Sequence, residues 1–326
     1  MSQAEEGVFC PCELFASATE RAALAGGRWL GRGDVRAAEE AAVTGMANAL
    51  DRLAIEGHVV VGADDDSGVL EIGSTVGQGG HAYDLAVDPL EGRSVVARGD
   101  YGAMAMIAVG DKGTFPQLPN TYMRKMAVGP VARGRIDLMG AVGDNVRAIA
   151  DAFGRNTNDI TAIVLDRPRH HDLVEEIRAA GARIKLIQDG DVTASITAAI
   201  RGTNDHLAIG IGGARQALIS AAALRCLGGE LQAQLWPTTR SEIDEAREHG
   251  IEDVERVFTT EELAPGHVIV AATGVSNSDL LRGVRYLADS ARTHSVVMCT
   301  RHNWVRFVDG IHFFARERRE EVRLLG

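Results

Sequence analysis

Residues 161–190, TAIVLDRPRHHDLVEEIRAAGARIKLIQDG, decide the fold class. Two short apolar runs, TAIVLD and ARIKLIQD, flank the amphipathic stretch HHDLVEEIRAAG. The alternation continues through DVTASITAAIRG, the glycine-rich run LAIGIGG and ARQALISAAALRCLGG, which ends at residue 229. Apolar strands that alternate with amphipathic helices predict a parallel sheet with helices on both faces. We therefore expect an α/β protein.

The first 160 residues follow a different pattern. Helices are predicted at 13–27, 37–57 and 142–154, and strand-like segments at 58–66, 69–77, 83–89, 103–115 and 123–130. Several of these strands end in carboxylates, which predicts that the acidic side chains gather at one sheet edge. The change of pattern suggests two subdomains, 1–160 with the acidic motif and 161–326 with the alternating elements.

Bulk composition excludes some classes of partner. The chain has 326 residues and a formal charge of −11, from 34 basic and 45 acidic side chains. Nucleic acids and anionic membranes attract basic surfaces, so neither is an expected partner. No apolar run approaches the roughly 20 residues that span a bilayer, and MSQAEEGVF lacks the layout of a signal peptide. We expect a cytoplasmic protein.

Side chains suited to covalent chemistry are scarce. Cys10, Cys12, Cys226 and Cys299 are too few and too scattered for a disulfide framework, and the Cys10-Pro-Cys12 spacing suits neither a zinc knuckle nor a redox pair. Surface thiols without a role are the expectation. The only lysines are Lys112, Lys125 and Lys185, which leaves few candidates for Schiff-base chemistry.

The segment DLAVDPLEGR, residues 84–93, places three carboxylates around a proline-containing turn. An acidic turn needs no function, because Asp, Pro and Gly favour turns. The same residues could hold a divalent cation, which takes oxygen ligands, or carry out general acid/base chemistry. GIGGA, residues 210–214, lies between a predicted strand and helix as a phosphate-binding turn would, although tight turns also need glycine for steric reasons. The residues alone leave these interpretations open.

Eight segments, in order along the chain, resemble the class II fructose-1,6-bisphosphatases of the lithium-sensitive, metal-dependent phosphatase superfamily. They are AALAGGRWLGRGD (22–34), DLAVDPLEG (84–92), AVGDKGTF (108–115), TYMRKMAVGP (121–130), RPRHHDLVEEIRAAGARI (167–184), DGDVTASI (189–196), IGIGGA (209–214) and AATGVSNSDLL (271–281). The resemblance implies a layered α-β-α-β-α sandwich of two subdomains with the active site between them. It also implies a homo-oligomer, and the apolar C-terminal strands suggest an interface.

The resemblance assigns roles to individual residues. Asp88 and Glu91 of the DPLEG motif would hold catalytic Mg²⁺ or Mn²⁺ against the scissile phosphate, followed by Arg93 at a catalytic position. The implied substrate-binding residues are Gly92, Tyr122, Arg167, Arg169, His170, Asp189, Asp191 and Gly213. Without the family, Tyr122 could be a core tyrosine and RPRHH a solvated basic turn.

Departures from the family pattern cluster at the implied metal site. Glu39 stands where the family has aspartate, Ala63 replaces a metal-binding glutamate, and Gln216 replaces another glutamate. Arg93 stands where a threonine would orient the attacking water, and arginine offers only donors and a fixed positive charge. The candidate metal ligands are therefore Glu39, Asp64 after a register shift, Asp88, Glu91 and Gln216, with Asp65 as a substitute for Asp64.

Three functions remain compatible with these residues. The first is a metal-dependent phosphatase that acts on a phosphorylated sugar. The second is a repurposed enzyme that binds a sugar phosphate or nucleotide sugar through Arg93, Arg167, Arg169 and Arg215 and performs elimination or isomerisation, with His81, His170 or His171 as the base. The third is a non-catalytic pseudophosphatase. The phosphatase is our main prediction.

Overall fold

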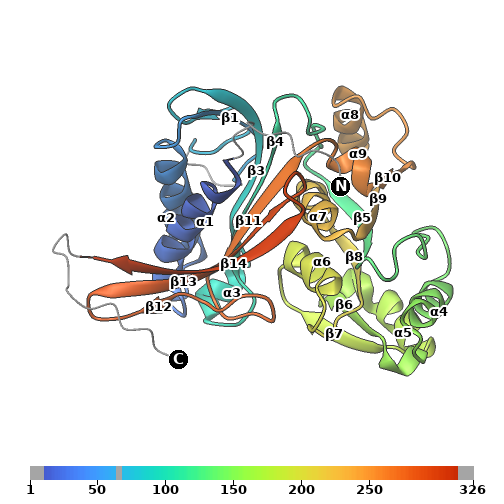
Figure 1. Ribbon diagram of the computed structural model, residues 1–326. Helices are drawn as coiled ribbons and strands as arrows, with labels where there is room; N and C mark the ends of the chain where they lie inside the picture. Colours follow the sequence, from blue (N-terminus) through green and yellow to red (C-terminus); the bar gives the residue numbers. More distant parts are fainter. Residues whose placement is uncertain (1–10, 64–67, 315–326) are drawn as a thin grey trace, which may run out of the picture.

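A computed structural model describes residues 11–63 and 68–314, and these form five layers (Figure 1). Helices α1 (Ala16–Gly26) and α2 (Val35–Leu50) cover one face of an eight-stranded sheet. Helices α6 (Asp191–Ala199) and α7 (Ala214–Leu227) lie between this sheet and a six-stranded one. On the far face of the second sheet lie α4 (Val142–Phe153) and α5 (His171–Ala179). The predicted α-β-α-β-α sandwich is confirmed.

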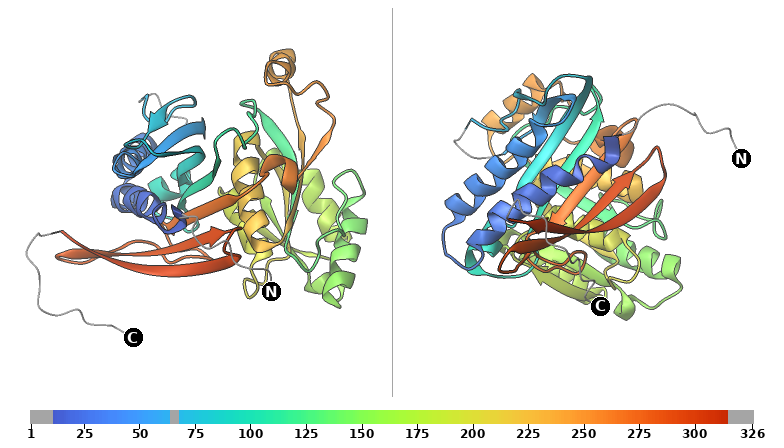
Figure 2. Two further views of the ribbon diagram at one scale, coloured as in Figure 1. Left: turned by 45° about the horizontal axis from the view of Figure 1, so that its top comes forward. Right: turned by 60° about the vertical axis from the view of Figure 1, so that its left-hand side comes forward.

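The eight-stranded sheet is largely antiparallel. Its order is β12-β13-β11-β4-β3-β1-β2, with β14 paired to β13, and only the β1–β3 pair is parallel among the described strands. The strands are β1 (Ile55–Val61), β2 (Thr75–Val76), β3 (His81–Glu91), β4 (Met104–Asp111), β11 (Val268–Gly274), β12 (Arg285–Tyr286), β13 (Ser290–Cys299) and β14 (Trp304–Phe313). The β13–β14 hairpin extends outward from the sandwich (Figure 2).

The six-stranded sheet is mixed. Its order is β10-β9-β5-β8-β6-β7, and the strands are β5 (Tyr122–Val128), β6 (Thr161–Leu165), β7 (Arg183–Ile187), β8 (Leu207–Gly213), β9 (Glu230–Leu235) and β10 (Val257–Thr259). The parallel arrangement expected from the alternating elements holds for β7, β6 and β8. The strands outside those elements, β5, β9 and β10, pair antiparallel. Strand β5 comes from the first half of the chain but lies in the middle of this sheet, between β9 and β8. Its direction therefore cannot be predicted from the alternation of strands and helices in the second half.

The central helix α7 is buried on nearly all sides. Nine of its residues, from Ala214 to Leu224, are buried, and five of these are alanines. A helix that is apolar all round belongs in a core, and alanines allow both sheets to approach its axis closely. The shorter elements are α3 (Arg93–Arg98), α8 (Arg240–Glu248), α9 (Thr260–Leu263), η1 (Pro11–Glu13), η2 (Gly27–Trp29), η3 (Thr157–Asp159) and η4 (Pro168–His170).

Two local predictions near the acidic strand were wrong. The helix expected over 37–57 ends at Leu50, and β1 begins at Ile55 with alternating buried positions. The strand expected over 69–77 shrinks to β2. Asp64 and Asp65 lie outside the described residues. The division into 1–160 and 161–326 stays a prediction. Strand β5 joins the sheet whose other strands come from the second half, and β11–β14 join β1–β4 in the eight-stranded sheet. Within the described residues, no helix has both the length and the apolar character needed to cross a membrane.

Candidate active site

A cavity of about 550 Å³ contains most of the predicted site residues. Its wall is built by the ends of β3 and β8, the start of α6 and α7, and the loops before β5 and α5. The predicted residues that line it are Glu39, Asp88, Glu91, Gly92, Arg93, Tyr122, Arg167, Arg169, Asp189, Asp191, Gly213 and Gln216. Ala63 lines it as well. Segments more than 150 residues apart in sequence therefore meet at one point.

The DPLEG turn presents its two acidic side chains to this cavity through a break in strand pairing. The register between β3 and β4 shifts between Asp88 and Glu91, around Pro89, which has no N–H for the ladder. Gly92 then adopts a left-handed conformation (φ 84°) and starts α3. A side chain there would be strained and would lie 3.2 Å from the Cα atom of Ala103, so the turn requires glycine. The first acidic residue of DLAVDPLEGR, Asp84, is instead structural, because its carboxylate accepts a hydrogen bond from the Phe115 N–H.

Glu91 connects the two sheets through the N-terminus of α6. Its carboxylate accepts hydrogen bonds from the N–H groups of Val192 (2.7 Å) and Thr193 (3.1 Å) and from the Thr193 hydroxyl. The side chain is only 5% exposed, and burial raises the pKa of Glu91, with the charges of Asp88 and Asp191 adding to the effect. The helix N-terminus supplies partial positive charge to this group.

Asp88 carries the electrostatic signature of a cation site. Burial raises its pKa to about 7, and the negative charges of Asp189 and Asp191 contribute further. A hydrogen bond from Gln216 and the charge of Arg93 lower it in part. The acidic side chains of the cavity thus carry more negative charge than its basic side chains neutralise. A bound divalent cation would offset this excess.

Arg93 and Glu39 neutralise each other at the cavity wall. The guanidinium Nη1 of Arg93, at the start of α3, donates to Glu39 Oε1 of α2 over 2.6 Å. The Glu39 side chain is 17% exposed, so solvent screens this pair only in part. Glu39 is therefore already paired with a cation, which weakens its candidacy as a metal ligand.

A basic and aromatic wall faces the carboxylates. The guanidinium of Arg169 stacks over the Tyr122 ring, 5.0 Å from its centroid, and donates to the Ile211 carbonyl. Arg167 donates to the carbonyls of Asp166 and Gln188. These bonds hold both arginines at the rim of the cavity, where bidentate capture of phosphate is possible. Ser94 donates to Asp189 and links this wall to α3.

Lys125 belongs to the site, and the motif analysis did not select it. It is 6% exposed, forms an ion pair with Asp191 and donates to the Gly213 carbonyl over 3.1 Å. A side chain at Gly212 would overlap Asp191, which explains why this glycine stands at the end of β8. The available signal was the position of Lys125 among apolar residues of a strand, where a lysine needs a buried partner.

His170 lies outside the cavity wall. Its Nδ1 lies 2.7 Å from the Leu165 carbonyl and its Nε2 accepts from the Ile211 N–H over 2.8 Å, which fixes a neutral tautomer. Burial lowers the pKa of His170. We therefore withdraw the predicted substrate contact and describe His170 as the anchor of the RPRHH loop on β8. His81 pairs with Asp111, and neither His81 nor His171 lines the cavity.

The comparisons with known proteins agree with this geometry. The family model described as bacterial fructose-1,6-bisphosphatase, glpX-encoded, matches residues 12–312. The chain belongs to the class II fructose-1,6-bisphosphatase family. The D-fructose 1,6-bisphosphatase class 2/sedoheptulose 1,7-bisphosphatase of Synechococcus sp. (strain JA-2-3B'a(2-13)) is 40% identical over 321 residues, covering 90% of this chain and 92% of the relative. The protein of that name from Thermosynechococcus vestitus is 38% identical over 327 residues, covering 91% and 94%.

Class II fructose-1,6-bisphosphatases are metal-dependent phosphatases, and the residues present fit a hard divalent cation. Asp88, Glu91 and Gln216 offer oxygen donors, and the raised pKa of Asp88 reflects its burial first and the neighbouring negative charges of Asp189 and Asp191 second. Among the described residues, no three carboxylates of the cavity bring oxygens within 4.8 Å of one another. This spacing suits an ion held by one or two carboxylates and completed by water and phosphate oxygens.

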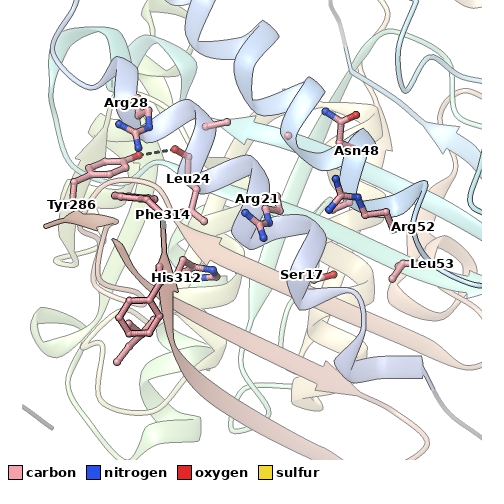
Figure 3. Close-up of a pocket in the computed structure, with 15 residues that line it drawn as sticks. Ser17, Arg21, Leu24, Arg28, Asn48, Arg52, Leu53, Tyr286, His312 and Phe314 are labelled. Carbon is pink, nitrogen blue, oxygen red and sulfur yellow. Dashed lines mark hydrogen bonds between the residues drawn. The ribbon is translucent and has the colours of Figure 1, made fainter. Parts of the chain in front are cut away.

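A second cavity, of about 820 Å³, lies between α1, α2 and the C-terminal strands (Figure 3). Arg21, Arg28 and Arg52 line it, and the Tyr286 hydroxyl at its edge donates to the Leu24 carbonyl. Its described lining contains no carboxylate. The larger cavity therefore lacks the acidic groups of the bisphosphatase site, and the smaller one is the candidate active site.

Proposed function

We propose that the protein hydrolyses one phosphate ester of a sugar bisphosphate in the 550 Å³ cavity. The observation that carries the proposal is the meeting of a carboxylate group, Asp88 and Glu91, with an arginine group, Arg167 and Arg169, in one cavity. The carboxylates can hold the metal ion that assists hydrolysis of one phosphate. The arginines can bind the other phosphate of the same sugar bisphosphate. The relatives' names make fructose 1,6-bisphosphate and sedoheptulose 1,7-bisphosphate the substrates to test.

The reaction consumes one water molecule. The water oxygen bonds to phosphorus, the bond between phosphorus and the sugar oxygen breaks, and the sugar oxygen takes up the proton that the water loses. Asp88 and Glu91 would hold a Mg²⁺ or Mn²⁺ ion, which would supply positive charge to the phosphate oxygens. The protein contributes mainly position and charge, as is general for phosphoryl transfer.

The other residues of the cavity orient the sugar. Asp189 offers a carboxylate for sugar hydroxyls and is itself held by Ser94. Asp191 lies beside it, with Lys125 fixing its orientation. The face of Tyr122 and the guanidinium of Arg169 form one stacked unit at the entrance. We propose that these groups set the distance between the two phosphates that the cavity accepts.

The metal-independent alternative has less support. Elimination or isomerisation needs a positioned base, and histidine was the expected one. None of the described residues that line the cavity is a histidine. Arg93, which was expected to bind an anion in that alternative, is paired with Glu39.

Phosphate release from the two sugar bisphosphates, with and without Mn²⁺ or Mg²⁺, tests the proposal. We expect phosphate release to be stimulated by the metal. Asp88→Asn should lower its rate by about 100-fold or more, which is the usual effect of removing a group that stabilises charge in the transition state. Asp100→Asn is the matched control, because this exposed aspartate pairs with Arg98 away from the cavity. Tight binding of both sugars without any release would favour the pseudophosphatase.

We further propose that β14 mediates self-association. Its residues Val305, Phe307, Ile311 and Phe313 share one face of the strand and are 37–51% exposed. The hairpin that carries them extends outward, where a second copy of the chain can cover it (Figure 2). Sedimentation of Phe307→Glu should show a smaller species than the unmodified chain. The cytoplasmic location stays a prediction.

A further inference from the structure

A cluster of two cysteines and one histidine lies outside both cavities. Cys12 is in η1, Cys299 ends β13, and His302 is in the turn before β14. Their sulfur and nitrogen atoms all lie within 4.8 Å of one another, and no other triplet of histidine, cysteine or acidic side chains in the described residues does so. Cys12 and Cys299 are 2% and 1% exposed, so the expectation of surface thiols was wrong for these two. Cys10 lies outside the described residues.

The two sulfur–nitrogen distances in the cluster match edges of a metal-centred tetrahedron. The Nδ1 atom of His302 lies 3.6 Å from the Cys12 sulfur and 3.4 Å from the Cys299 sulfur. With Zn–S bonds of about 2.3 Å and Zn–N bonds of about 2.0–2.1 Å, tetrahedral geometry places sulfur and nitrogen about 3.5–3.6 Å apart. A single Nδ1 atom has one lone pair or one N–H. One Nδ1 atom therefore cannot form two full hydrogen bonds, one to each sulfur. A cation bound to all three atoms would account for both short distances.

The backbone and a neighbouring ring preorganise the histidine. Cys299 and His302 are three residues apart in the turn between β13 and β14, and Asn303, directly after the histidine, adopts a left-handed conformation (φ 52°). The Trp304 ring stacks on the His302 ring, with centroids 5.6 Å apart and planes at 18°. His302 is exposed while both thiols are buried, so a bound ion would keep one side open to solvent.

We propose that Cys12, Cys299 and His302 form a Zn²⁺ site that is separate from the catalytic cavity. Two thiolates and one imidazole are the donors that Zn²⁺ prefers over Mg²⁺ and Mn²⁺, which take oxygen ligands. Binding removes one proton from each thiol and uses a neutral histidine, so each ion releases up to two protons. The fourth position is filled by water.

The site would hold the N-terminal segment against the β13–β14 hairpin. Its ligands are separated by 287 residues of sequence between Cys12 and Cys299, and both thiols pack in the core beneath α1 and α2. None of the three residues lines the catalytic cavity. We therefore expect Zn²⁺ to raise the unfolding temperature of the whole chain without replacing the catalytic metal.

Cobalt substitution tests this site directly. The full-length, reduced, metal-free protein is titrated with Co²⁺, and thiolate-to-Co²⁺ charge-transfer absorption is measured before Zn²⁺ is added to displace it. We expect this absorption at one equivalent, its loss in Cys299→Ser and in His302→Ala, and its retention in the matched control Cys226→Ser. His302 is exposed, so His302→Ala separates lost binding from failed folding. Ions in the catalytic cavity give no such absorption, since no cysteine lines its described wall.

Thermal unfolding and proton release give independent readouts. Zn²⁺ should raise the unfolding temperature of the parent and of Cys226→Ser but not of His302→Ala, and release close to two protons per ion. Absence of the thiolate band in the reduced parent would overturn the proposal. So would its survival in both Cys299→Ser and His302→Ala, or a Cys12–Cys299 disulfide that forms in air while the reduced form binds no metal.

Discussion

Arg93 and Glu39 form an ion pair with 2.6 Å between Nη1 and Oε1, at the wall of a cavity that otherwise has an excess of negative charge. The family resemblance places a metal-binding carboxylate at Glu39 and an uncharged residue at Arg93. In this chain, the arginine supplies fixed positive charge beside the same carboxylate. We interpret the pair as a built-in counter-ion that reduces the number of metal ions the cavity needs.

Arg93→Thr should therefore strengthen metal binding. Removing the guanidinium leaves Glu39 able to act as a ligand and takes away a repulsive charge beside Asp88. We expect the half-saturating Mn²⁺ concentration for phosphate release to fall by roughly threefold to tenfold, the effect of one unit of charge near the ion. Mn²⁺ titrations at fixed sugar bisphosphate measure this.

The control for this substitution is Arg98→Thr, in the last turn of the same helix, where the arginine pairs with Asp100. It should leave the Mn²⁺ dependence unchanged. If Arg93→Thr instead abolishes sugar-bisphosphate binding at all Mn²⁺ concentrations, Arg93 contacts the substrate and the counter-ion interpretation is wrong.

The fold was largely predictable because its motifs are local. Strand β3, helix α4 and the elements from β6 to α7 follow from periodicity, and the five layers follow from the family resemblance. The start of β1 was missed, since Ile55 and its alternating partners directly follow a long alanine-rich helix. The antiparallel pairing of β5 with β8 and β9 depends on contacts between distant segments, which no local pattern encodes.

The site was predictable as a set of residues but not as a set of contacts. Asp88, Asp189 and Gln216 do line one cavity, as the motifs implied. The motifs could not show that Glu39 forms an ion pair with Arg93. They also could not show that both ring nitrogens of His170 contact backbone groups next to its own loop and in β8. Such pairings depend on how side chains are placed relative to one another, to within a few tenths of an ångström. The packing of the whole fold sets this placement, and the identity of a single residue does not.

The pKa of Asp88 predicts an unusual pH dependence for the metal-free protein. It is raised from 3.8 to about 7 in the folded state, so the folded protein holds a proton that the unfolded chain has already released. Stability is therefore greatest at low pH within this window and falls as the pH rises from about 4 to 7. We expect a loss of about 1–3 kcal/mol in urea unfolding at several pH values, reduced but not abolished by Asp88→Asn, because the pKa of the buried Glu91 is raised as well.

Manganese should reverse this trend, because the ion binds the ionised carboxylate and competes with the proton. Unfolding at saturating Mn²⁺ should thus show stability rising with pH through the same window. The same slope with and without Mn²⁺, or a metal-free slope that is as steep in Asp88→Asn as in the parent, would exclude Asp88 as the titrating ligand.

Gly212→Ala should damage the cavity without disrupting the sandwich. The added Cβ would overlap Asp191 Oδ2 and would lie 2.9 Å from Lys125 Nζ, so the ion pair must move. We expect kcat/KM for sugar bisphosphate to fall about tenfold or more and the free energy of unfolding to fall by about 1–3 kcal/mol. Gly143→Ala in the first turn of α4 is the control, because its nearest contact, Arg147 Nη1 at 3.4 Å, is ordinary. Equal kinetics for both variants would contradict the role of the pair.

The Lys125–Asp191 pair gives the last prediction. Lys125→Met keeps the length and apolar character of the side chain but leaves Asp191, 20% exposed, beside Asp88 and Glu91 without its cation. An unpaired, largely buried charge is strongly destabilising, and we expect a loss of about 2–3 kcal/mol after allowing for its partial exposure. The double variant Lys125→Met/Asp191→Asn should recover at least half of this loss, because it removes the stranded charge. Lys112→Met, which breaks an exposed contact with Glu56, should change stability little. Urea unfolding of the parent, Lys125→Met, Asp191→Asn, the double variant and Lys112→Met decides the matter. Additive losses in the double variant would mean that the two residues stabilise the fold independently, and that Asp191 does not need Lys125 to occupy the cavity.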